Sequence, residues 1–502
     1  MAGTFLYGSS VKSYPGKFTN WVFWTYFVTI LWGLLFGYNL GVSGGVSSMD
    51  SFLKNFFPEV YQQEKNIKPW DDQTLTLFTS SLYLAVLVAS VFAPTVIRLL
   101  GRRTTMICAG VLILGGAELN DFALNVRMLI VGRILIDLGI GCANKSLSIY
   151  ISEVDPYKHI GVLNMMFKFT ITVGIFVANV INYNYVEEEN GEGWRYSLRF
   201  PTILALIIIC SASSLPRLPS FFMEHGLDGK AKTKLIEIRG ITYVNEEFED
   251  LVTASECSKA VKHPWISLLK RRYRPQLTFA IAIPFFQQLT GMNVIVFYAP
   301  ILFKTIGFGV NASFMSTMIT GGCHAITTLV SIFTVDKFDR RTLFLVGGIQ
   351  MFIGQIFVAI ACKFGLDGNP EMLPKYATVA VWGICVYMTG FAWSWSPLGW
   401  LVPSEIFSLE VRSAAQSINI SMNMILTFAI MQIFTIMLYH IKFGLFIFFA
   451  CFVIVMNIFI YSLLSETKGV SIEEMYVVWQ SHSYWKKFVE PDAEVKTTND
   501  EC

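Results

Sequence analysis

Residues 441–464 read IKFGLFIFFACFVIVMNIFIYSLL, and Lys442 is the only charged side chain among them. A helix needs about twenty predominantly apolar residues to cross the ~30 Å hydrocarbon core of a bilayer. The stretch is long enough for this crossing. It therefore predicts a helix that spans a membrane.

Further apolar stretches of comparable length recur along the chain. They fall at about residues 21–45, 76–97, 104–123, 127–147, 161–183, 200–216, 277–303, 313–335, 342–362, 378–403 and 412–438. With 441–464 they predict an all-α membrane protein of twelve transmembrane helices. An even number of spans places both termini on the same side of the membrane.

The composition supports a membrane-embedded chain and argues against other classes of protein. Charged residues form 15% of the 502 residues, against roughly a quarter in soluble domains, and hydrophobic residues form 54%. The first twenty residues contain no short apolar core ahead of a cleavage site, so we expect the first apolar stretch to remain as an anchor. The cysteines form no disulfide framework, and no Cys/His cluster suggests a metal. A net charge of +2 gives no reason to expect a nucleic-acid partner, and no catalytic motif indicates an enzyme.

Positive charges predict the orientation, because loops rich in Lys and Arg stay in the cytoplasm. The cations gather between spans two and three, between spans eight and nine, and in the long segment 221–276. The loops on the opposite side carry fewer cations, and residues 187–192 are acidic. We therefore expect both termini in the cytoplasm.

A repeat with a period of roughly 240–250 residues relates the two halves of the chain. Gly-Arg-Arg at 101–103 corresponds to Asp-Arg-Arg at 339–341, and Ser-Glu at 152–153 corresponds to Ser-Glu at 404–405. The repeat predicts two six-helix bundles. The expected segments are a cytoplasmic N-terminus (1–20), a first bundle (21–220) with an outer lid loop (46–75), a cytoplasmic linker with short helices (221–276), a second bundle (277–465) and a cytoplasmic tail (466–502).

Several motifs resemble those of one transporter family. They are FQQLTGMN at 286–293, VDKF at 335–338, GWLVPSEIF at 399–407, ETKG at 466–469, TSSLY at 79–83 and IEEM at 472–475. The chain thereby resembles the plant monosaccharide (hexose)/proton symporters of the sugar porter family, in the major facilitator superfamily. The resemblance implies the major facilitator fold and alternating-access carriage of a monosaccharide across the plasma membrane. It also implies a monomeric transport unit and no cofactor apart from a possible coupling proton.

Amide side chains in these motifs suit a sugar, because an amide both donates and accepts hydrogen bonds, as hydroxyl groups do. At 100° per residue, Gln287, Gln288 and Asn293 share a broad helix face. The resemblance implies a sugar site made of Gln287, Gln288, Asn293, Trp400, Asn419, Asn423, Lys168 and His324. The alternative is that buried amides only bond neighbouring helices.

A second set of charged residues corresponds to the cytoplasmic gate of the family, in which arginines pair with glutamates while the outer side is open. The residues are Arg102, Arg103, Glu153, Arg217, Arg340, Arg341, Glu405, Arg412 and Glu466. In the first half, Ile160 stands where the second half has Arg412, so our hypothesis is that Glu153 turns to Arg217. The alternative at Glu153 is simple decay of the motif. For the whole set of charges, the alternative is that they only set the topology.

Membrane-embedded positions of the first half depart from the family. The coupling proton of the family is carried by an aspartate where this chain has Asn39, although the partner arginine is retained as Arg133. An amide carries no proton, so we expect weak or absent coupling. Asp137, one helical turn from Arg133, is the only good candidate carrier otherwise. Glu118 and Asp121 are further carboxylates where the family has small residues.

Lys168 stands where the family has a sugar-binding glutamine. Ionisable groups inside a bilayer are costly and normally pair. We therefore expect Asp137 or another carboxylate of the first half at ion-pair distance, with lower affinity for neutral hexoses. If Lys168 contacts the substrate directly, an acidic sugar is a better candidate substrate than a neutral one. An uncoupled facilitator and a transport-silent sensor or degenerate copy remain as alternative functions.

The outer loop 46–75 contains no cysteine. In the family this loop carries a cysteine that pairs with one just before the last helix, where this chain has Tyr439. The sequence therefore predicts a lid without a disulfide, in which Phe52, Phe56, Phe57 and Trp70 pack on the bundle.

Overall fold

The computed structural model describes most of the chain. The described residues are 19–65, 73–154, 160–186, 188, 191–224, 226–241, 244–249, 252, 264–305, 309–335, 337–367, 373–408, 411–441, 444–468, 470 and 475–489. Within these ranges, the structure does not describe the side chains of some residues, among them Glu153, Ser404 and Arg412.

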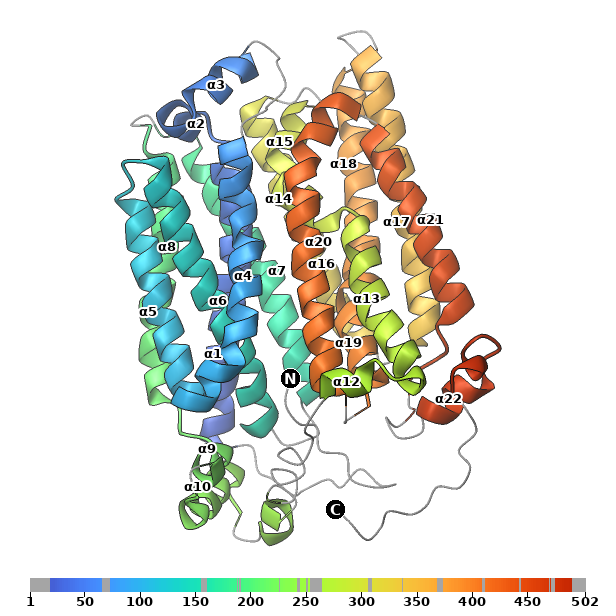
Figure 1. Cartoon of the computed structure of the whole chain (residues 1–502). Coiled ribbons are helices and arrows are strands. Elements are labelled where there is room, and N and C mark those ends of the chain that lie inside the picture. Colours follow the sequence, from blue (N-terminus) through green and yellow to red (C-terminus); the bar gives the residue numbers. More distant parts are fainter. Residues whose placement is uncertain are drawn as a thin grey trace.

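The long helices of the described residues lie side by side in two halves (Figure 1). Grouped into spans, they give six in each half, as the sequence predicted. The first half contains α1 (Asn20–Val46), α4 (Gln73–Leu100), α5 (Arg102–Asp121), α6 (Val126–Val154), α7 (Ile160–Tyr185) and α8 (Gly193–Ser214). The second half contains α13 (Arg274–Leu289), α14 (Met292–Phe297), α15 (Ala299–Thr305), α16 (Val310–Thr334), α17 (Arg340–Asp367), α18 (Leu373–Gly390), a π-helical segment η3 (Phe391–Trp395), α19 (Ser396–Ile406), α20 (Arg412–Ile441) and α21 (Gly444–Leu463). α13 to α15 together form one span, and α18 to α19 form another.

Nine helices in the described part of the chain are long and apolar enough to cross a membrane. The other three spans have identifiable reasons for their lower hydropathy or shorter length. α5 and α6 carry charged side chains within the span, among them Asp121, Arg133 and Asp137. The third is divided by the π-helical turn at Phe391–Trp395.

Glycines let α1 and α7 cross at close range. Gly33, Gly37 and Gly41 recur every fourth residue and so share one face of α1. A Cβ at Gly37 would lie 1.8 Å from the carbonyl oxygen of Ile171 on α7. Small-residue faces of this kind bring membrane helices into backbone contact. This contact positions α7, which carries Lys168, against α1.

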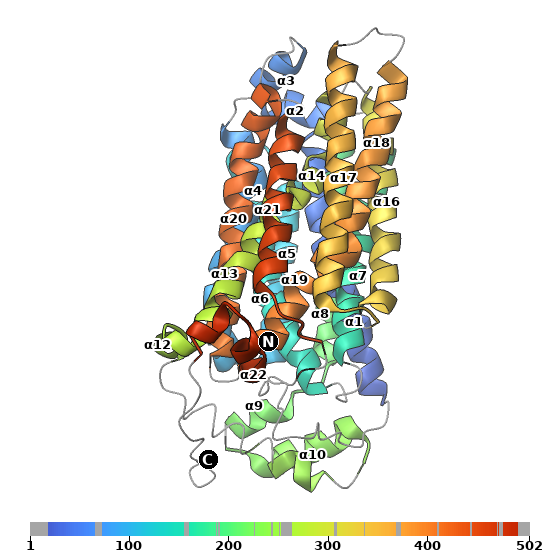
Figure 2. The same cartoon turned by 90° about the vertical axis from the view of Figure 1, so that its right-hand side faces the viewer.

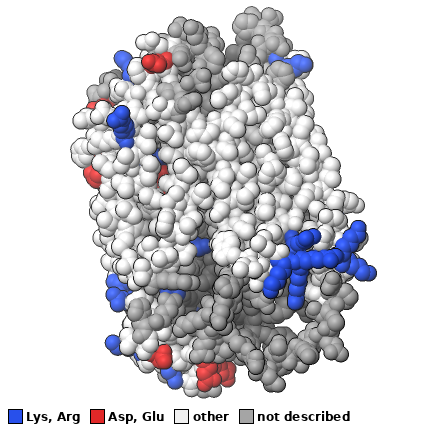
Figure 3. Space-filling view, viewed as in Figure 1, with Lys and Arg blue, Asp and Glu red and all other residues white. Residues whose placement is uncertain are grey.

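Short helices occupy the two ends of the bundle (Figures 1 and 2). At one end lie α9 (Pro219–Glu224), α10 (Asp228–Arg239), α12 (Pro264–Leu268), η1 (Arg271–Tyr273), α22 (Met475–Ser481) and η4 (Trp485–Lys487). Lys and Arg gather at this end near α12 in Figure 3, as expected for a cytoplasmic face. α10 is held by a buried ion pair between Arg239 and Glu247, 2.7 Å long, and Arg239 also donates to the carbonyl of Val154.

The opposite end carries the lid helices α2 (Asp50–Phe56) and α3 (Pro58–Lys65). The ring of Phe52 lies 5.7 Å from those of Phe78 and Trp194, and Phe56 lies 5.2 Å from Trp194. Together with the buried Phe57, these contacts confirm the predicted packing of the lid. Trp70 lies outside the described residues. The seven cysteines in the described part of the chain are all free thiols.

Candidate transport site

The span that contains the FQQLTGMN motif breaks at Gly291, between α13 and α14. Gly291 has φ +80°, a left-handed conformation that glycine adopts without strain. The break frees the carbonyl of Thr290, which accepts hydrogen bonds from Gln355 Nε2 at 3.0 Å and Tyr387 Oη at 2.8 Å. The span that the sequence predicted at about 277–303 is present, with this break inside it. The break places Asn293 after a turn.

The amides of the motif form hydrogen bonds across this break and to neighbouring helices. Asn293 Nδ2 donates to Gln288 Oε1 at 2.8 Å. Asn423 Nδ2 on α20 donates to Gln287 Oε1 at 3.2 Å. Gln287 Nε2 in turn donates to the carbonyl of Trp395 at 3.1 Å, so α13, α20 and η3 meet at one side chain. These bonds suit both a polar lining and simple helix-to-helix bonding.

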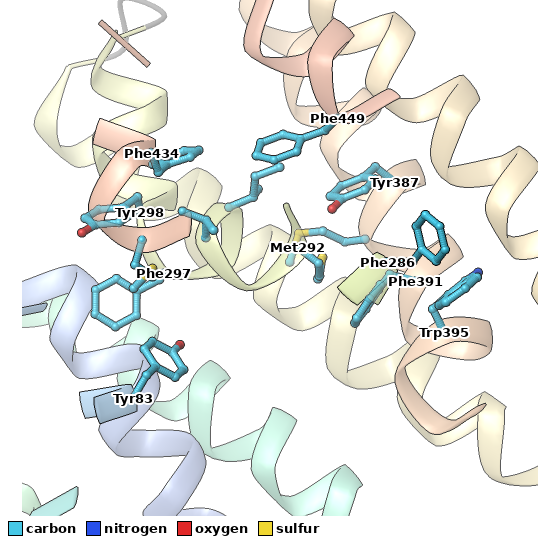
Figure 4. Packing of buried hydrophobic residues seen from close by; sticks show 14 of the residues in the cluster. Tyr83, Phe286, Met292, Phe297, Tyr298, Tyr387, Phe391, Trp395, Phe434 and Phe449 are labelled. Atoms are coloured by element: carbon cyan, nitrogen blue, oxygen red, sulfur yellow. The ribbon is translucent and has the colours of Figure 1, made fainter. Parts of the chain in front are cut away.

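Two aromatic residues flank the amides. Trp395 is fully buried, and its Nε1 donates to the carbonyl of Phe344 at 3.2 Å. Figure 4 shows it beside Phe391 and Phe286 in the second half. Trp400, which is half-buried, lies one turn further along α19. Its neighbour Gly399 packs so tightly on Gln287 that a Cβ there would lie 2.6 Å from Nε2.

Lys168 of α7 reaches across to Trp400 of the second half. Its Nζ lies 4.4 Å from the centre of the Trp400 ring, in a cation–π contact. Among the described residues no carboxylate lies within ion-pair distance of this ammonium. The predicted partner Asp137 instead pairs with Arg133, so the expected ion pair of Lys168 is wrong. An aromatic face has taken the place of the carboxylate.

Two further predicted binding residues, His324 and Asn419, are buried, and each has a polar atom without a hydrogen-bond partner in the described part of the chain. His324 lies on α16, which packs against α7, and its Nε2 has no hydrogen-bond partner in the described part of the chain. Asn419 is buried on α20, and its Oδ1 likewise has none there. Asn179 of α7 donates to the carbonyl of Thr317 on α16 at 3.5 Å, a polar contact that our sequence analysis missed. Asn179 could have been found from the sequence, because it is an amide within an otherwise apolar helix.

A charged cluster lies fully buried between α1 and α6. Asn39 Nδ2 donates to Asp137 Oδ1 at 2.6 Å. Arg133 Nε lies 3.9 Å from Asp137 Oδ2, and Arg133 also donates to the carbonyl of Asn39 at 3.4 Å. Among the described residues, Asp137 Oδ2 has no hydrogen-bond partner. The carboxylate therefore lies beside position 39, with one oxygen bonded to Asn39 and the other in the ion pair with Arg133.

Asp121 has a different environment from Asp137. It forms a bidentate pair with Arg199 of α8, at 2.9 and 3.1 Å, and the Arg199 side chain is half exposed. Paired and close to the end of α5, Asp121 is a structural carboxylate.

The second half has a connected charge cluster at the end of the bundle that carries α12. Arg340 pairs with Glu405 at 3.1 Å. The backbone N–H groups of Arg340 and Arg341 donate to Glu466 at 2.9 and 3.1 Å, and Thr467 Oγ1 donates to Glu405 at 2.6 Å. The cluster thus joins the start of α17, the end of α19 and the segment after α21.

The corresponding residues of the first half form fewer described contacts. Ser146 donates to the carbonyl of Arg102 at 2.6 Å, and Arg103 donates to the carbonyl of Ser213. Arg217 lies over the ring of Phe221 at 5.3 Å. The structure does not describe the side chains of Glu153 and Arg412. The hypothesis that Glu153 turns to Arg217 therefore stays a prediction, as does the pairing of Arg412.

Replacing Arg340 by alanine is expected to destabilise the second half. The change leaves Glu405 without its cation in a largely buried position, which costs about 3 kcal/mol. Thermal unfolding of the purified chain in detergent measures the effect as a lowered midpoint. Lys337→Ala, at an exposed neighbouring position, is the control and should leave the midpoint unchanged. Equal midpoints for both variants would contradict a structural role for the cluster.

At the lid end, the two halves touch. Thr79 and Tyr298 share a hydrogen bond of 2.7 Å between their hydroxyls, and Gln432 donates to Ser80 at 2.5 Å. Tyr298 stacks on Phe434 at 5.4 Å, as Figure 4 shows. Lys304 pairs with Asp50 of α2 at 3.0 Å. Helices α4 and α1 of the first half are therefore in contact with α14, α15 and α20 at this end.

Two six-helix halves whose polar side chains meet at their junction define a solute carrier of the major facilitator class. Residues 25–479 match the family described as "Sugar (and other) transporter". The chain belongs to this family, whose members are transporters and not enzymes, and it is a multi-pass membrane protein.

Curated relatives match over almost the whole chain. Sugar transport protein 1 of Arabidopsis thaliana is 55% identical over 498 residues, 97% of this chain and 95% of the relative. Sugar carrier protein C of Ricinus communis is 55% identical over 491 residues, 96% of this chain and 94% of the relative. These matches confirm the resemblance to plant sugar transporters.

Solved structures show the same fold. The proton:xylose symporter XylE bound to 6-bromo-6-deoxy-D-glucose superimposes with a TM-score of 0.74 at 24% identity, covering 91% of this chain and 99% of that one. An inward open conformation of the xylose transporter XylE from E. coli gives a TM-score of 0.76 at 23% identity, with the same coverage. The predicted fold class is therefore confirmed.

Proposed function

We propose that this chain carries a monosaccharide across the plasma membrane by alternating access. The amides of the second half and Lys168 of the first half converge on neighbouring residues of α19, Gly399 and Trp400. A solute bound there touches both halves and so responds to their relative movement. The proposal includes a monomeric transport unit and cytoplasmic termini. The names of the plant relatives support a sugar as the solute.

Replacing Gln288 or Trp400 by alanine is expected to reduce counterflow of radiolabelled hexose in proteoliposomes about tenfold or more. Loss of a buried hydrogen-bonding partner costs ~1–3 kcal/mol, and loss of the ring removes an apolar wall for the sugar. Asn184→Ala removes an exposed amide on α7 and serves as the control. Counterflow at the wild-type rate in both site variants would rule out this location for the sugar.

We further propose that transport is coupled to protons through Asp137. The prediction of weak coupling rested on Asn39, which cannot carry a proton. The hydrogen bond between Asn39 and Asp137 supports the opposite outcome, because it puts a carboxylate within 2.6 Å of that amide. Compared with the family pattern, the carboxylate has moved from α1 to α6 while its arginine neighbour is kept. An uncoupled facilitator remains the alternative.

A further inference from the structure

We propose that the sugar carried by this chain bears a carboxylate, and that Lys168 is the residue that selects it. The inference rests on the proposed function and narrows its substrate class to sugar acids, such as hexuronates. Lys168 thus becomes a specificity-determining residue.

The first observation is the environment of the ammonium. Lys168 lies in the first third of α7, within the apolar span Met165–Tyr185, and its Nζ contacts the Trp400 ring at 4.4 Å. Within the described part of the chain no carboxylate is at ion-pair distance. The partner expected from the sequence, Asp137, instead contacts Asn39 and Arg133. An ammonium inside a bilayer normally pairs or faces a water-filled cavity, and a carboxylate on the solute would pair with it.

The second observation is the position of Trp400 next to the amides. Gly399, which precedes it, is in contact with Gln287, and Gln287 bonds Asn423. We expect a pyranose ring bound beside Trp400 to present hydroxyls to the amides and one end to the ammonium. This is the arrangement that a sugar with one charged terminal group requires.

Two buried polar atoms on helices at the junction lack hydrogen-bond partners among the described residues. His324 Nε2 on α16 and Asn419 Oδ1 on α20 are buried without hydrogen-bond partners among the described residues. Both residues lie on helices that line the junction, since α16 packs on α7 and α20 on α4. A buried polar atom without a partner is costly, and a bound polar solute supplies one. Together with Lys168 they favour an anionic, hydroxyl-rich ligand over a neutral one.

The test is uptake into proteoliposomes of radiolabelled glucuronate and glucose by the full chain. We expect wild type to take up glucuronate at least tenfold faster than glucose. Lys168→Gln should lower glucuronate uptake at least tenfold and raise glucose uptake, so that the preference reverses. Lys168→Arg keeps a cation at this position and should retain the preference for glucuronate.

A thermal-unfolding measurement in detergent checks binding independently of transport. Glucuronate should raise the midpoint of wild type and Lys168→Arg but not that of Lys168→Gln. A wild-type preference for glucose, or an unchanged glucuronate-to-glucose ratio in Lys168→Gln, would overturn the substrate inference and leave the proposed sugar transport intact. Folded wild-type protein that takes up neither solute would overturn the proposed function itself.

Discussion

Asp137→Asn is expected to abolish accumulation of sugar driven by a pH gradient, while exchange of sugar between the two sides continues. Asp137 is fully buried, hydrogen-bonded to Asn39 and 3.9 Å from Arg133. Proton coupling needs one group that gains and loses a proton as the halves move, and an amide at 137 cannot do so. Exchange requires only binding and alternating access, and neither involves a proton on this residue.

The measurement compares uptake with and without an inward proton gradient against counterflow without a gradient. In Asp137→Asn, gradient-driven accumulation should fall to the equilibrium level, at least tenfold below wild type. Glu237→Gln, at an exposed position of α10, is the control and should behave as wild type.

A reciprocal exchange of the two side chains provides a sharper test. Because Asn39 and Asp137 are hydrogen-bonded, the double variant Asn39→Asp/Asp137→Asn keeps one amide and one carboxylate in contact. It should restore a large part of the gradient-driven accumulation that Asp137→Asn loses. Strong accumulation that survives Asp137→Asn alone would contradict the coupling role of this carboxylate. Wild type that shows no response to the gradient would establish the uncoupled alternative.

The spans were predictable because the bilayer imposes one simple requirement, a long apolar segment. Errors occur where a helix extends beyond the apolar core or changes geometry inside it. α8 begins at Gly193 and not near residue 200, because its first turns carry Trp194, Arg195 and Arg199. Side chains of this kind suit a membrane–water boundary and resemble a loop in a hydropathy pattern. The π-helical turn and the break at Gly291 change few residues and leave hydropathy unaffected.

The candidate site was predictable in its residue types but not in its pairings. Amides at 287, 288 and 293 follow from the motif, whereas the bond between Gln287 and Asn423 depends on how α13 packs against α20. The same holds for Lys168. The sequence shows that a charged lysine lies inside a membrane span, which is energetically unfavourable, and we expected a carboxylate to pair with it. The structure supplies an aromatic face, because α7 and α19 meet at the junction of the halves.

Gly44→Ala is expected to reduce sugar uptake at least tenfold without unfolding the protein. Gly44 lies near the lid end of α1, and a Cβ there would lie 1.7 Å from the carbonyl oxygen of Phe297 on α14. The obstructing atom belongs to the backbone of a short helix, so it cannot turn away as a side chain could. The two halves would be held apart at the lid end, where Thr79 and Tyr298 now bond. Alternating access requires this end to close.

The matched control is Gly115→Ala on α5, where a Cβ has no neighbouring heavy atom within 4 Å. It should transport and unfold as wild type does, and it gains a small amount of helix propensity. Gly44→Ala should still bind sugar in detergent, because the amides and Trp400 are untouched, yet fail to release it on the other side of the membrane. Cross-linking of cysteines introduced at Thr79 and Tyr298 reports the closure directly, and it should be slower in the Gly44→Ala background. Wild-type uptake together with wild-type cross-linking in Gly44→Ala would show that the contact between α1 and α14 can loosen without consequence, and that closure of the lid end does not depend on it.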